Sequence, residues 1–155
     1  MKIRKYQEKD KEKVKKLVTE VLTELFGKAV IKEWENFKEY AIFYVAEDKG
    51  DIIGSAALKS EGNKTGKLKR MYVLKDYRKK GIGQRLFNKI RYFAEKNNFS
   101  KILLSTGKEL MQAYNFYIKN GFRELKNIDW EKNFAELKKE DVNINNVVFM
   151  EKNLI

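Results

Sequence analysis

The sequence predicts an α/β fold of the mixed α+β kind, with one central, mostly antiparallel sheet of about seven strands flanked by about four helices. Short apolar runs alternate along the chain with amphipathic segments of helical period. The runs between residues 41 and 74 are separated by short polar turns, as in an antiparallel meander. The 155 residues include no proline and no linker-like segment, which favours a single domain over residues 1–155.

The N-terminal part is expected to form a strand and helical segments before the meander begins. A short strand is predicted at residues 1–6, and an apolar stripe at helical spacing predicts a helix ending at Gly27. The stripe consists of Val14, Leu17, Val18, Val21, Leu22 and Leu25. A second helical face is expected from Val30, Trp34, Phe37 and Ala41. The unbroken apolar run at residues 41–46 then predicts a buried strand.

Two further strands of the meander are predicted at residues 52–58 and 67–74. The second of these has an unusual pattern. Leu68 and Met71 are an odd number of residues apart, so a regular strand would point them to opposite faces of the sheet. Either a β-bulge brings both side chains to one face, or the strand is buried on both faces.

The C-terminal half is expected to alternate helices and strands. The predicted order is a helix from the glycine turn to about residue 97, a strand at 101–105, a helix at about 108–120 capped by Gly121, a strand at 122–126 and a strand at 147–151. Residues 127–146 form a long excursion with a weak helical pattern. One mixed sheet with helices on both faces is the simplest assembly of these elements.

A glycine turn within residues 76–86 joins the last strand of the meander to the next helix. That helix has one apolar face, formed by Ile82, Leu86, Ile90 and Phe93. Gly81 and Gly83 therefore lie at the N-terminal end of the helix. There the first N–H groups lack intrahelical partners, the helix dipole is positive, and glycine lets a phosphate approach the backbone closely. The turn is thus predicted to bind a diphosphate.

Positive charge is concentrated around this turn. Residues 64–91 contain eleven Lys or Arg and one acid, a net charge of +10 out of +12 for the whole chain. Arg78, Lys79 and Lys80 directly precede the glycines. A dinucleotide-binding fingerprint would require a third glycine where this chain has Leu86, and the Gly-Lys-Ser/Thr of a P-loop is absent. Neither of the two common nucleotide-binding loops therefore describes the turn.

Two motifs resemble the GNAT superfamily of N-acetyltransferases. The glycine turn resembles that family's cofactor motif, Gln/Arg-x-x-Gly-x-Gly/Ala, filled here by Arg78, Gly81 and Gly83. Residues 113–122, Ala-Tyr-Asn-Phe-Tyr-Ile-Lys-Asn-Gly-Phe, resemble its Ala-x-x-Phe-Tyr-x-x-x-Gly-Phe element. Both motifs occur in the expected order with a strand-like run between them, and the resemblance covers about residues 40–125.

The resemblance implies that acetyl-coenzyme A is the cosubstrate and that its acetyl group passes directly to a primary amine in a ternary complex. It places the diphosphate on the glycine turn and the pantetheine arm along the preceding strand, which in the family is bulged and splays from the next. The cofactor-binding residues expected on this basis are Met71, Tyr72, Val73, Arg78, Lys79, Lys80, Gly81, Ile82, Gly83 and Gln84.

Tyr117 is the candidate general acid, because it occupies the position of the family's frequent acid. A phenol with a pKa of about 10 stays protonated at neutral pH and can donate a proton to a leaving thiolate. A plain core role is the alternative, since Leu110, Ala113, Tyr114 and Tyr117 follow helical spacing. Many relatives have an asparagine at the position of Leu110, so that cofactor contact is not expected here.

No general base is assigned. Relatives often have a glutamate on the strand before the glycine turn, whereas Lys67, Lys69 and Arg70 occupy that strand here. The carboxylates that could line an acceptor pocket are Glu33, Glu35 and Glu39 beside Trp34, and Asp129 and Glu131 beside Trp130. A solvated charged face is the simpler interpretation of both groups, and a chain of waters could take the proton instead.

The absence of cysteine and histidine excludes several kinds of chemistry. The chain has no disulfide framework, no Cys-His or Ser-His nucleophile and no common transition-metal ligand set, so direct transfer without a metal is expected. No apolar run approaches the roughly 18 residues of a membrane span, and the N-terminus does not resemble a signal peptide. A cytoplasmic protein without membrane association is expected.

Two other functions fit parts of the sequence. A nucleic-acid-binding module would use the net charge of +12 and the aromatic residues Tyr72 and Tyr77, but the charge gathers around one turn, which disfavours nucleic acid as a partner. A non-catalytic acyl-coenzyme A sensor also fits, because the usual base is missing. The acceptor, a small-molecule amine or a peptide or protein amino group, is not identified, although the positive charge leans toward neutral or acidic acceptors. In the family that the sequence resembles, a homodimer is a common arrangement, and here it would pair through the C-terminal strand or through residues 127–146.

Overall fold

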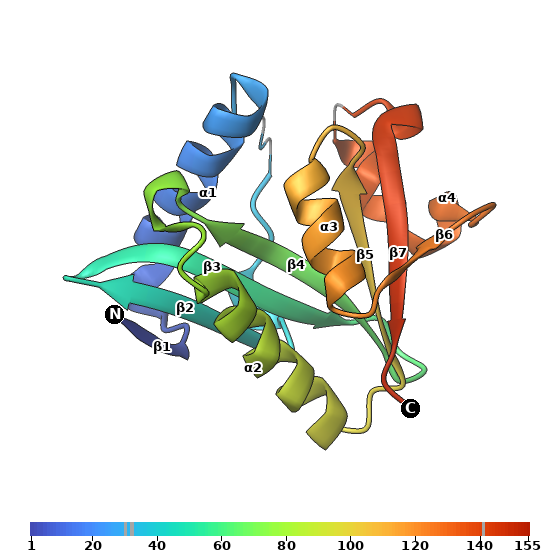
Figure 1. Ribbon diagram of the computed structural model, residues 1–155, viewed down its shortest axis with the longest axis horizontal. Helices are drawn as coiled ribbons and strands as arrows, with labels where there is room; N and C mark the ends of the chain where they lie inside the picture. Colours follow the sequence, from blue (N-terminus) through green and yellow to red (C-terminus); the bar gives the residue numbers. More distant parts are fainter. Residues whose placement is uncertain (30, 32, 141) are drawn as a thin grey trace.

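The computed structural model describes residues 1–29, 31, 33–140 and 142–155. Its described residues form a seven-stranded sheet in the order β1-β2-β3-β4-β5-β7-β6 (Figure 1). The strands are β1 (Lys2–Lys5), β2 (Ile42–Asp48), β3 (Asp51–Ser60), β4 (Thr65–Val73), β5 (Lys101–Gly107), β6 (Arg123–Leu125) and β7 (Val147–Asn153). Strands β4 and β5 are parallel and the other neighbouring pairs are antiparallel. The predicted mixed, mostly antiparallel sheet is confirmed.

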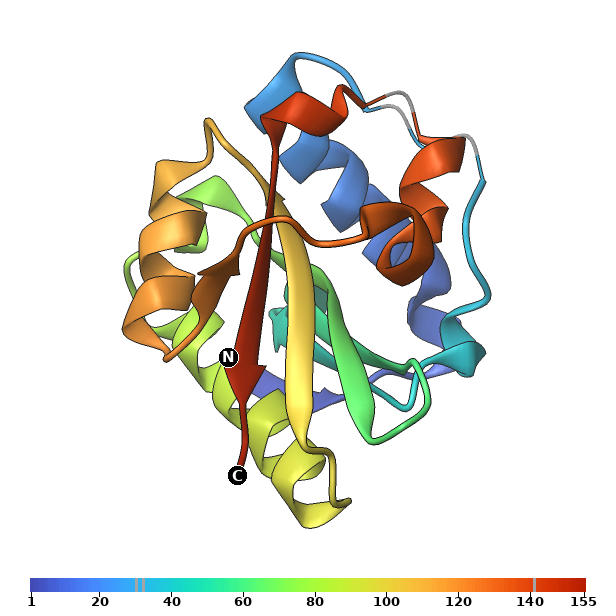
Figure 2. The same cartoon turned by 90° about the vertical axis from the view of Figure 1, so that its right-hand side faces the viewer.

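Helices cover both faces of the sheet, as predicted. The α-helices are α1 (Lys11–Phe26), α2 (Ile82–Lys96), α3 (Met111–Lys119) and the single turn α4 (Trp130–Asn133). Short 3-10 turns occur at η1 (Glu8–Asp10), η2 (Phe37–Glu39), η3 (Lys75–Tyr77), η4 (Ala135–Lys139) and η5 (Ile144–Asn146). Figure 2 shows α2 and α3 on one face, and α1 with the segment that contains α4 on the other. No helix within the described ranges is long and apolar enough to cross a membrane.

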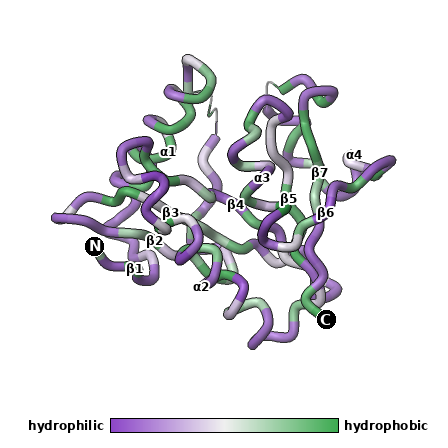
Figure 3. The backbone as a smooth tube through the Cα atoms, viewed as in Figure 1, coloured by the Kyte–Doolittle hydropathy of each residue, from purple (hydrophilic) through white to green (hydrophobic). Residues whose placement is uncertain are grey.

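Each face of the sheet has its own apolar core. On the α2 face, Leu86, Phe87 and Ile90 are fully buried against the sheet. On the α1 face, Val14 and Val18 of the predicted stripe are fully buried. Figure 3 shows the hydrophobic stretches in the interior strands and the hydrophilic ones at the hairpin tips. The helix α1 ends where it was predicted to end, because Gly27 adopts the left-handed conformation with φ 76°.

The second helical face predicted before the first meander strand is wrong in the described part of that segment; Val30 lies outside the described residues. Only the 3-10 turn η2 forms there. Asn36 has extended backbone angles, and its side chain accepts a hydrogen bond from the Lys38 N–H at 3.0 Å, which starts that turn instead of an α-helix. Trp34 and Phe37 pack edge to face with ring centroids 6.0 Å apart, so these aromatic residues anchor an irregular segment to the sheet.

The predicted β-bulge in the strand before the glycine turn is present. The β3–β4 register shifts between Ser55 and Ala57, and Arg70 adopts left-handed backbone angles with φ 51°. The Ser55 hydroxyl donates to the Arg70 carbonyl at 2.7 Å and holds the bulge in place. As a result Leu68 and Met71 both pack against the α2-face cluster, although they are an odd number of residues apart.

The excursion at residues 127–146 is packed, with less helix than its pattern suggested. A side chain from β4 fixes it: Lys67 is 2% exposed, donates to the Asn133 carbonyl at 2.6 Å and pairs with Glu136 at 2.8 Å. Phe134, which belongs to the excursion, is fully buried in a cluster with Leu103 and Phe149 of the sheet. The helix predicted from about residue 108 begins only at Met111, because Gly107 to Leu110 form a turn.

Candidate functional site

The backbones of β4 and β5 diverge in the middle of the sheet, and the region between their diverging ends is called the slot below. The two strands pair only from Thr65 to Lys67 with Lys101 to Leu103. Beyond this short ladder they diverge, as Figure 1 shows. The remaining β5-facing edge of β4 therefore has no strand partner, and unpaired backbone groups of this kind can hydrogen-bond an extended ligand. Met71, Tyr72 and Val73 lie on that part of β4.

The glycine turn follows β4 and has the geometry of an anion-binding helix end. Gly81 is the N-cap of α2, in the left-handed conformation with φ 82°. The Arg85 N–H makes the first intrahelical bond, to the Gly81 carbonyl at 3.0 Å, so the N–H groups of Ile82, Gly83 and Gln84 have no partner within the helix. A Cβ at Gly83 would meet only ordinary contacts, Met71 Cε at 3.5 Å and Val73 Cγ2 at 3.8 Å. A small side chain at this position would therefore not clash with the protein.

The three cations before the glycines do not share one role. Lys79 and Lys80 are exposed, and neither forms an ion pair within the described residues. The Arg78 guanidinium is instead engaged by the protein: it donates to the Val73 carbonyl at 2.9 Å and to both carboxylate oxygens of Glu24 at 2.9 and 2.6 Å. These hydrogen bonds hold the pKa of Glu24 below its ordinary value. Arg78 thus ties the turn to α1.

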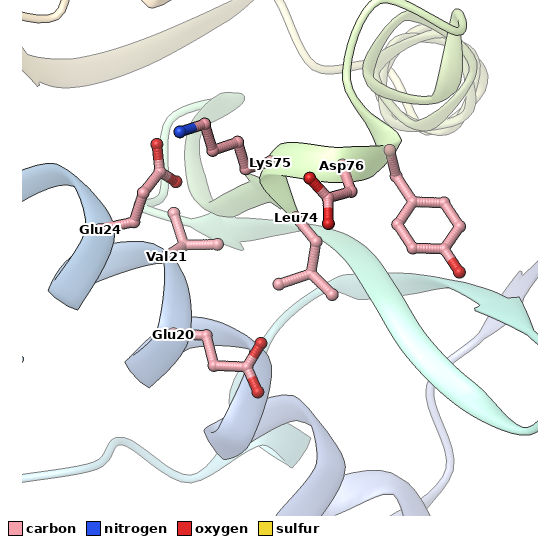
Figure 4. A pocket seen from close by; sticks show the side chains of 7 residues that line it. Glu20, Val21, Glu24, Leu74, Lys75 and Asp76 are labelled. Carbon is pink, nitrogen blue, oxygen red and sulfur yellow. The ribbon is translucent and has the colours of Figure 1, made fainter.

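A cavity of about 210 Å³ lies beside this tie, between α1 and the η3 turn (Figure 4). Glu20 and Glu24 line it from α1, and Lys75 and Asp76 line it from the turn. Three of these four charged side chains are acidic, which disfavours a phosphate in the cavity. The helix end at Gly81 is the better place for an anion.

The two sequence motifs meet through a pair of side-chain amides. Gln84, in the first turn of α2, and Asn120, at the end of α3, hydrogen-bond each other at 2.8 and 3.1 Å. Asn120 also donates to the Phe116 carbonyl at 2.8 Å. The end of α3 is therefore fixed against the start of α2, and the side chain of Gln84 is committed to the protein while its backbone N–H is free of a helical partner.

The structure brings Tyr117 to the slot. Its ring packs between Phe116 and Phe122, each with its centroid 5.6 Å away, and the residue is 8% exposed. No hydrogen bond of the Tyr117 hydroxyl occurs among the described residues. Burial raises the pKa of Tyr117, and the neighbouring Tyr72 phenol raises it further. The side chain is thus a packed ring with an available proton donor.

On the opposite face, the bulge places Arg70 against the irregular segment before β2. Its Nε and Nη2 donate to the two carboxylate oxygens of Glu35 at 3.0 and 2.9 Å, and its guanidinium lies 5.4 Å from the centroid of the Trp34 ring. The remaining carboxylates that the sequence suggested for an acceptor pocket do not come together in the structure. Glu33 and Glu39 are exposed, Asp129 caps α4, and Glu131 pairs with Lys138 at 3.3 Å.

Sequence reasoning did not anticipate this Arg70–Glu35 pair, nor the carboxylates that the 127–146 excursion brings to β4. Glu136 pairs with Lys69 at 3.3 Å as well as with Lys67. Burial raises the pKa of Glu140, while the Lys69 and Arg70 cations oppose that rise. The one available signal was the odd spacing in β4, which indicated the bulge but not the partners of its side chain. No cluster of three or more potential metal ligands occurs in the parts of the chain that the structure describes.

Comparison with known proteins assigns the family. Residues 39–124, more than half of the chain, match the model of the acetyltransferase (GNAT) domain. A β4–β5 slot, a glycine turn at a helix end and a tyrosine at the slot are all contained in that range. The chain belongs to the GNAT acetyltransferase family, which is a family of acyltransferases, and the resemblance found in the sequence is confirmed.

Two curated relatives are similar over part of their length. Streptothricin acetyltransferase A of Bacillus subtilis (strain 168) is 31% identical over 108 residues, which are 64% of this chain and 62% of that protein. N-acetylaspartate synthetase of Danio rerio is 37% identical over 84 residues, which are 54% of this chain and 30% of that protein. The chain thus spans less than two thirds of either relative.

Solved structures share the whole fold. A GNAT-family acetyltransferase of Staphylococcus aureus Mu50 superposes with a TM-score of 0.81 at 26% identity, covering 99% of each chain. N-acetylglutamate synthase of Neisseria gonorrhoeae, solved with coenzyme A and N-acetyl-glutamate, has a TM-score of 0.77 at 18% identity and covers 99% of this chain but 35% of that one. The second likeness is one of fold alone.

Proposed function

We propose that this chain is an N-acetyltransferase that moves an acetyl group from acetyl-coenzyme A to a primary amine by direct attack in a ternary complex. The observation that supports the proposal is that three features lie against one stretch of β4: its edge has no strand partner, Gly83 faces Met71 and Val73, and the Tyr117 phenol neighbours Tyr72. A soluble cytoplasmic enzyme made of one domain over residues 1–155 is part of the same proposal.

The parts of the slot match the parts of the cosubstrate. The N–H groups of Ile82, Gly83 and Gln84 would receive the diphosphate, and the exposed cations Lys79 and Lys80 would add favourable charge. The open edge of β4 at Met71 to Val73 would pair with the amide groups of the pantetheine arm. Arg78 would hold the turn in place without contacting the diphosphate, because its guanidinium is bound to Glu24.

The chemistry needs a nucleophilic amine, a polarised thioester and a proton for the leaving sulfur. The amine attacks the acetyl carbonyl carbon, the C–S bond breaks, and the thiolate takes a proton. Tyr117 is the donor in this proposal, because its raised pKa keeps the phenol protonated until the thiolate forms. Proton transfer of this kind contributes about 100- to 10,000-fold to a rate. The amine proton leaves to water or to a nearby carboxylate.

Initial-rate kinetics test the proposal. The protein is mixed with acetyl-coenzyme A and each amine of a panel, and the release of the free coenzyme A thiol is measured. The panel includes aspartate and glutamate, because two similar proteins are an N-acetylaspartate synthetase and an N-acetylglutamate synthase. We expect amine-dependent release, with intersecting lines when both substrates are varied, because direct attack requires both to be bound. Parallel lines would instead indicate an acetyl-enzyme intermediate. Tight binding of acetyl-coenzyme A without release for any amine would support a sensor.

A further inference from the structure

Arg70 has a strained backbone at the bulge of β4. Its φ of 51° is the left-handed region, which costs a non-glycine residue free energy and which tends to persist at ligand sites. The Ser55 hydroxyl pins the Arg70 carbonyl at 2.7 Å, so the bulge has a fixed geometry. The side chain is 14% exposed, deep enough for its interactions to be little screened by solvent.

The guanidinium is only partly satisfied by the protein. Glu35 takes the Nε and Nη2 edge in a bidentate pair at 3.0 and 2.9 Å. No hydrogen bond of Nη1 occurs among the described residues, and the phenol of Tyr72 is a close neighbour of the guanidinium. A guanidinium has five N–H donors in a rigid plane, so a second planar anion can bind the remaining edge while Glu35 stays in place. The Trp34 ring, 5.4 Å away, supports the plane from one side.

Arg70 directly precedes the stretch of β4, Met71 to Val73, whose edge has no strand partner. Tyr72 interacts with Arg70 on one side and with Tyr117 on the other, since the charge of Arg70 and the phenol of Tyr117 are both coupled to it. The order of side chains is therefore Glu35, Arg70, Tyr72, Tyr117, leading from the irregular segment before β2 to the proposed proton donor. A small acceptor held at Arg70 would have its amine near the slot.

Both cations and carboxylates surround Arg70. Lys69, the next cation along β4, is tied to Glu136 at 3.3 Å, and Lys15 lies 5.6 Å from the centroid of the Trp34 ring. Glu35 is paired with Arg70 itself, and the charge of Glu140 also reaches Arg70 and Tyr72. Two cations thus flank the aromatic ring where an acceptor would bind.

We propose, on the basis of the acetyl transfer above, that Arg70 binds a carboxylate of the acceptor through its free edge, so that the substrates are amino acids or other primary amines with a carboxylate a few bonds from the amine. Glu35 positions the guanidinium and does not contact the substrate. This assigns to Arg70 the choice of acceptor, which the cofactor motif does not determine.

Matched acceptor pairs test the assignment by turnover. L-Aspartate, L-glutamate and glycine are compared with their carboxamide counterparts, which have the same amine without the anion. We expect kcat/KM to be about 10- to 100-fold higher for the acids, the range of a charge-assisted bidentate hydrogen bond. Arg70→Gln should remove that preference, while Lys69→Gln, a matched loss of charge on the same strand, should keep it.

Glu35→Gln separates substrate binding from a merely structural ion pair. The glutamine keeps an amide oxygen that can hold the guanidinium and removes a negative charge beside the proposed substrate carboxylate, so acids should be used as well as by the wild type or up to a few-fold better. If the pair only held the fold together, Glu35→Gln and Arg70→Gln would lose activity and melting temperature alike. Arg70→Lys keeps the charge without the fork and should recover only part of the preference.

A binding measurement makes the inference independent of turnover. The chain has two tryptophans, so Trp130→Phe leaves Trp34 as the fluorescent reporter beside Arg70. With coenzyme A present, L-glutamate and glycine should change Trp34 emission, and Arg70→Gln should abolish the change. A response without thiol release would reject the acetyltransferase and keep the carboxylate site. No response together with equal use of acids and carboxamides, or a preference for carboxamides, would overturn the assignment of Arg70.

Discussion

The two ends of the slot differ in how they are built. The cofactor end is made by a continuous stretch of chain: the end of β4, the glycine turn and the first turn of α2. The acceptor end that we propose is assembled from segments far apart in sequence, with Arg70 on β4 and with Trp34 and Glu35 before β2. A local structure can be recognised from its residues, whereas an assembled one depends on long-range packing.

The difference also separates the two tasks of the enzyme. The cofactor is common to the family, and its end of the slot uses backbone N–H groups and glycines that any acyl-coenzyme A can meet. The acceptor is specific to each member, and its end uses side chains held by ion pairs such as Arg70 with Glu35. Mutations at the two ends should therefore affect different kinetic constants.

The largest effect is expected at Tyr117, between the two ends. Tyr117→Phe keeps the packed ring and removes only the hydroxyl, so kcat should fall about 100- to 10,000-fold with the affinity for acetyl-coenzyme A nearly unchanged. Tyr114→Phe is the matched control, because Tyr114 lies one turn earlier on α3 and its hydroxyl contacts Glu124 at 3.3 Å. Steady-state kinetics and thermal melts distinguish a catalytic hydroxyl from a tyrosine that only packs in the core. A Tyr117→Phe enzyme with full turnover, or one that melts much earlier than wild type, would favour the core-tyrosine interpretation.

A smaller effect is expected from the exposed cations at the cofactor end. The double variant Lys79→Gln/Lys80→Gln should raise the KM for acetyl-coenzyme A about 2- to 30-fold, since each exposed charge contributes about 0.2 to 1 kcal/mol. Its KM should also depend less on salt than that of the wild type. Lys138→Gln/Lys139→Gln makes the same charge change in the excursion and serves as control. Equal shifts in both double variants would mean that only net charge matters.

The ion pair between Arg78 and Glu24 predicts a change of a few-fold in the affinity for acetyl-coenzyme A. If Arg78 acts by fixing the turn against α1, both Arg78→Gln and Glu24→Gln should lower the affinity for acetyl-coenzyme A by about 2- to 5-fold. Each should also cost about 1 kcal/mol or less of stability, because the ion pair is partly exposed. If Arg78 instead swings to the diphosphate, Glu24→Gln should bind the cofactor more tightly than wild type. Calorimetric titration of the two variants distinguishes these cases.

The smallest effect concerns pH. Burial raises the pKa of Tyr117 above its ordinary value of 10.0, so its donor proton is retained and kcat should show no loss from this group below about pH 10. The folded state holds this proton more tightly than the unfolded state, so the associated stability is complete below pH 10 and declines as the pH rises further. Melts between pH 8 and 11 should show a steeper alkaline loss for wild type than for Tyr117→Phe. Parallel curves would contradict the burial of an ionisable phenol.

Sequence alone predicted the parts that depend on local pattern. The strands, α1 and α2 followed from periodicity, the odd spacing in β4 left a bulge as one of two alternatives, and the position of Gly81 at a helix end followed from the stripe after it. The segment around Trp34 was wrongly expected to be helical, because its aromatic residues match helical spacing but anchor separately to the sheet. The Arg70–Glu35 pair, 35 residues apart in sequence, could not be predicted since no local pattern encodes it.

Titration of acetyl-coenzyme A into wild type and Gly83→Val tests the central claim most directly. Gly83 is the right position because a side chain there meets only ordinary contacts in the protein, whereas Gly81 has a φ of 82° and any replacement would strain the turn. The valine should fill the space that the diphosphate needs and raise the Kd by at least about 100-fold, or about 2.7 kcal/mol, with an unchanged thermal melt. Equal affinities for the two proteins would show that acetyl-coenzyme A does not bind at this turn.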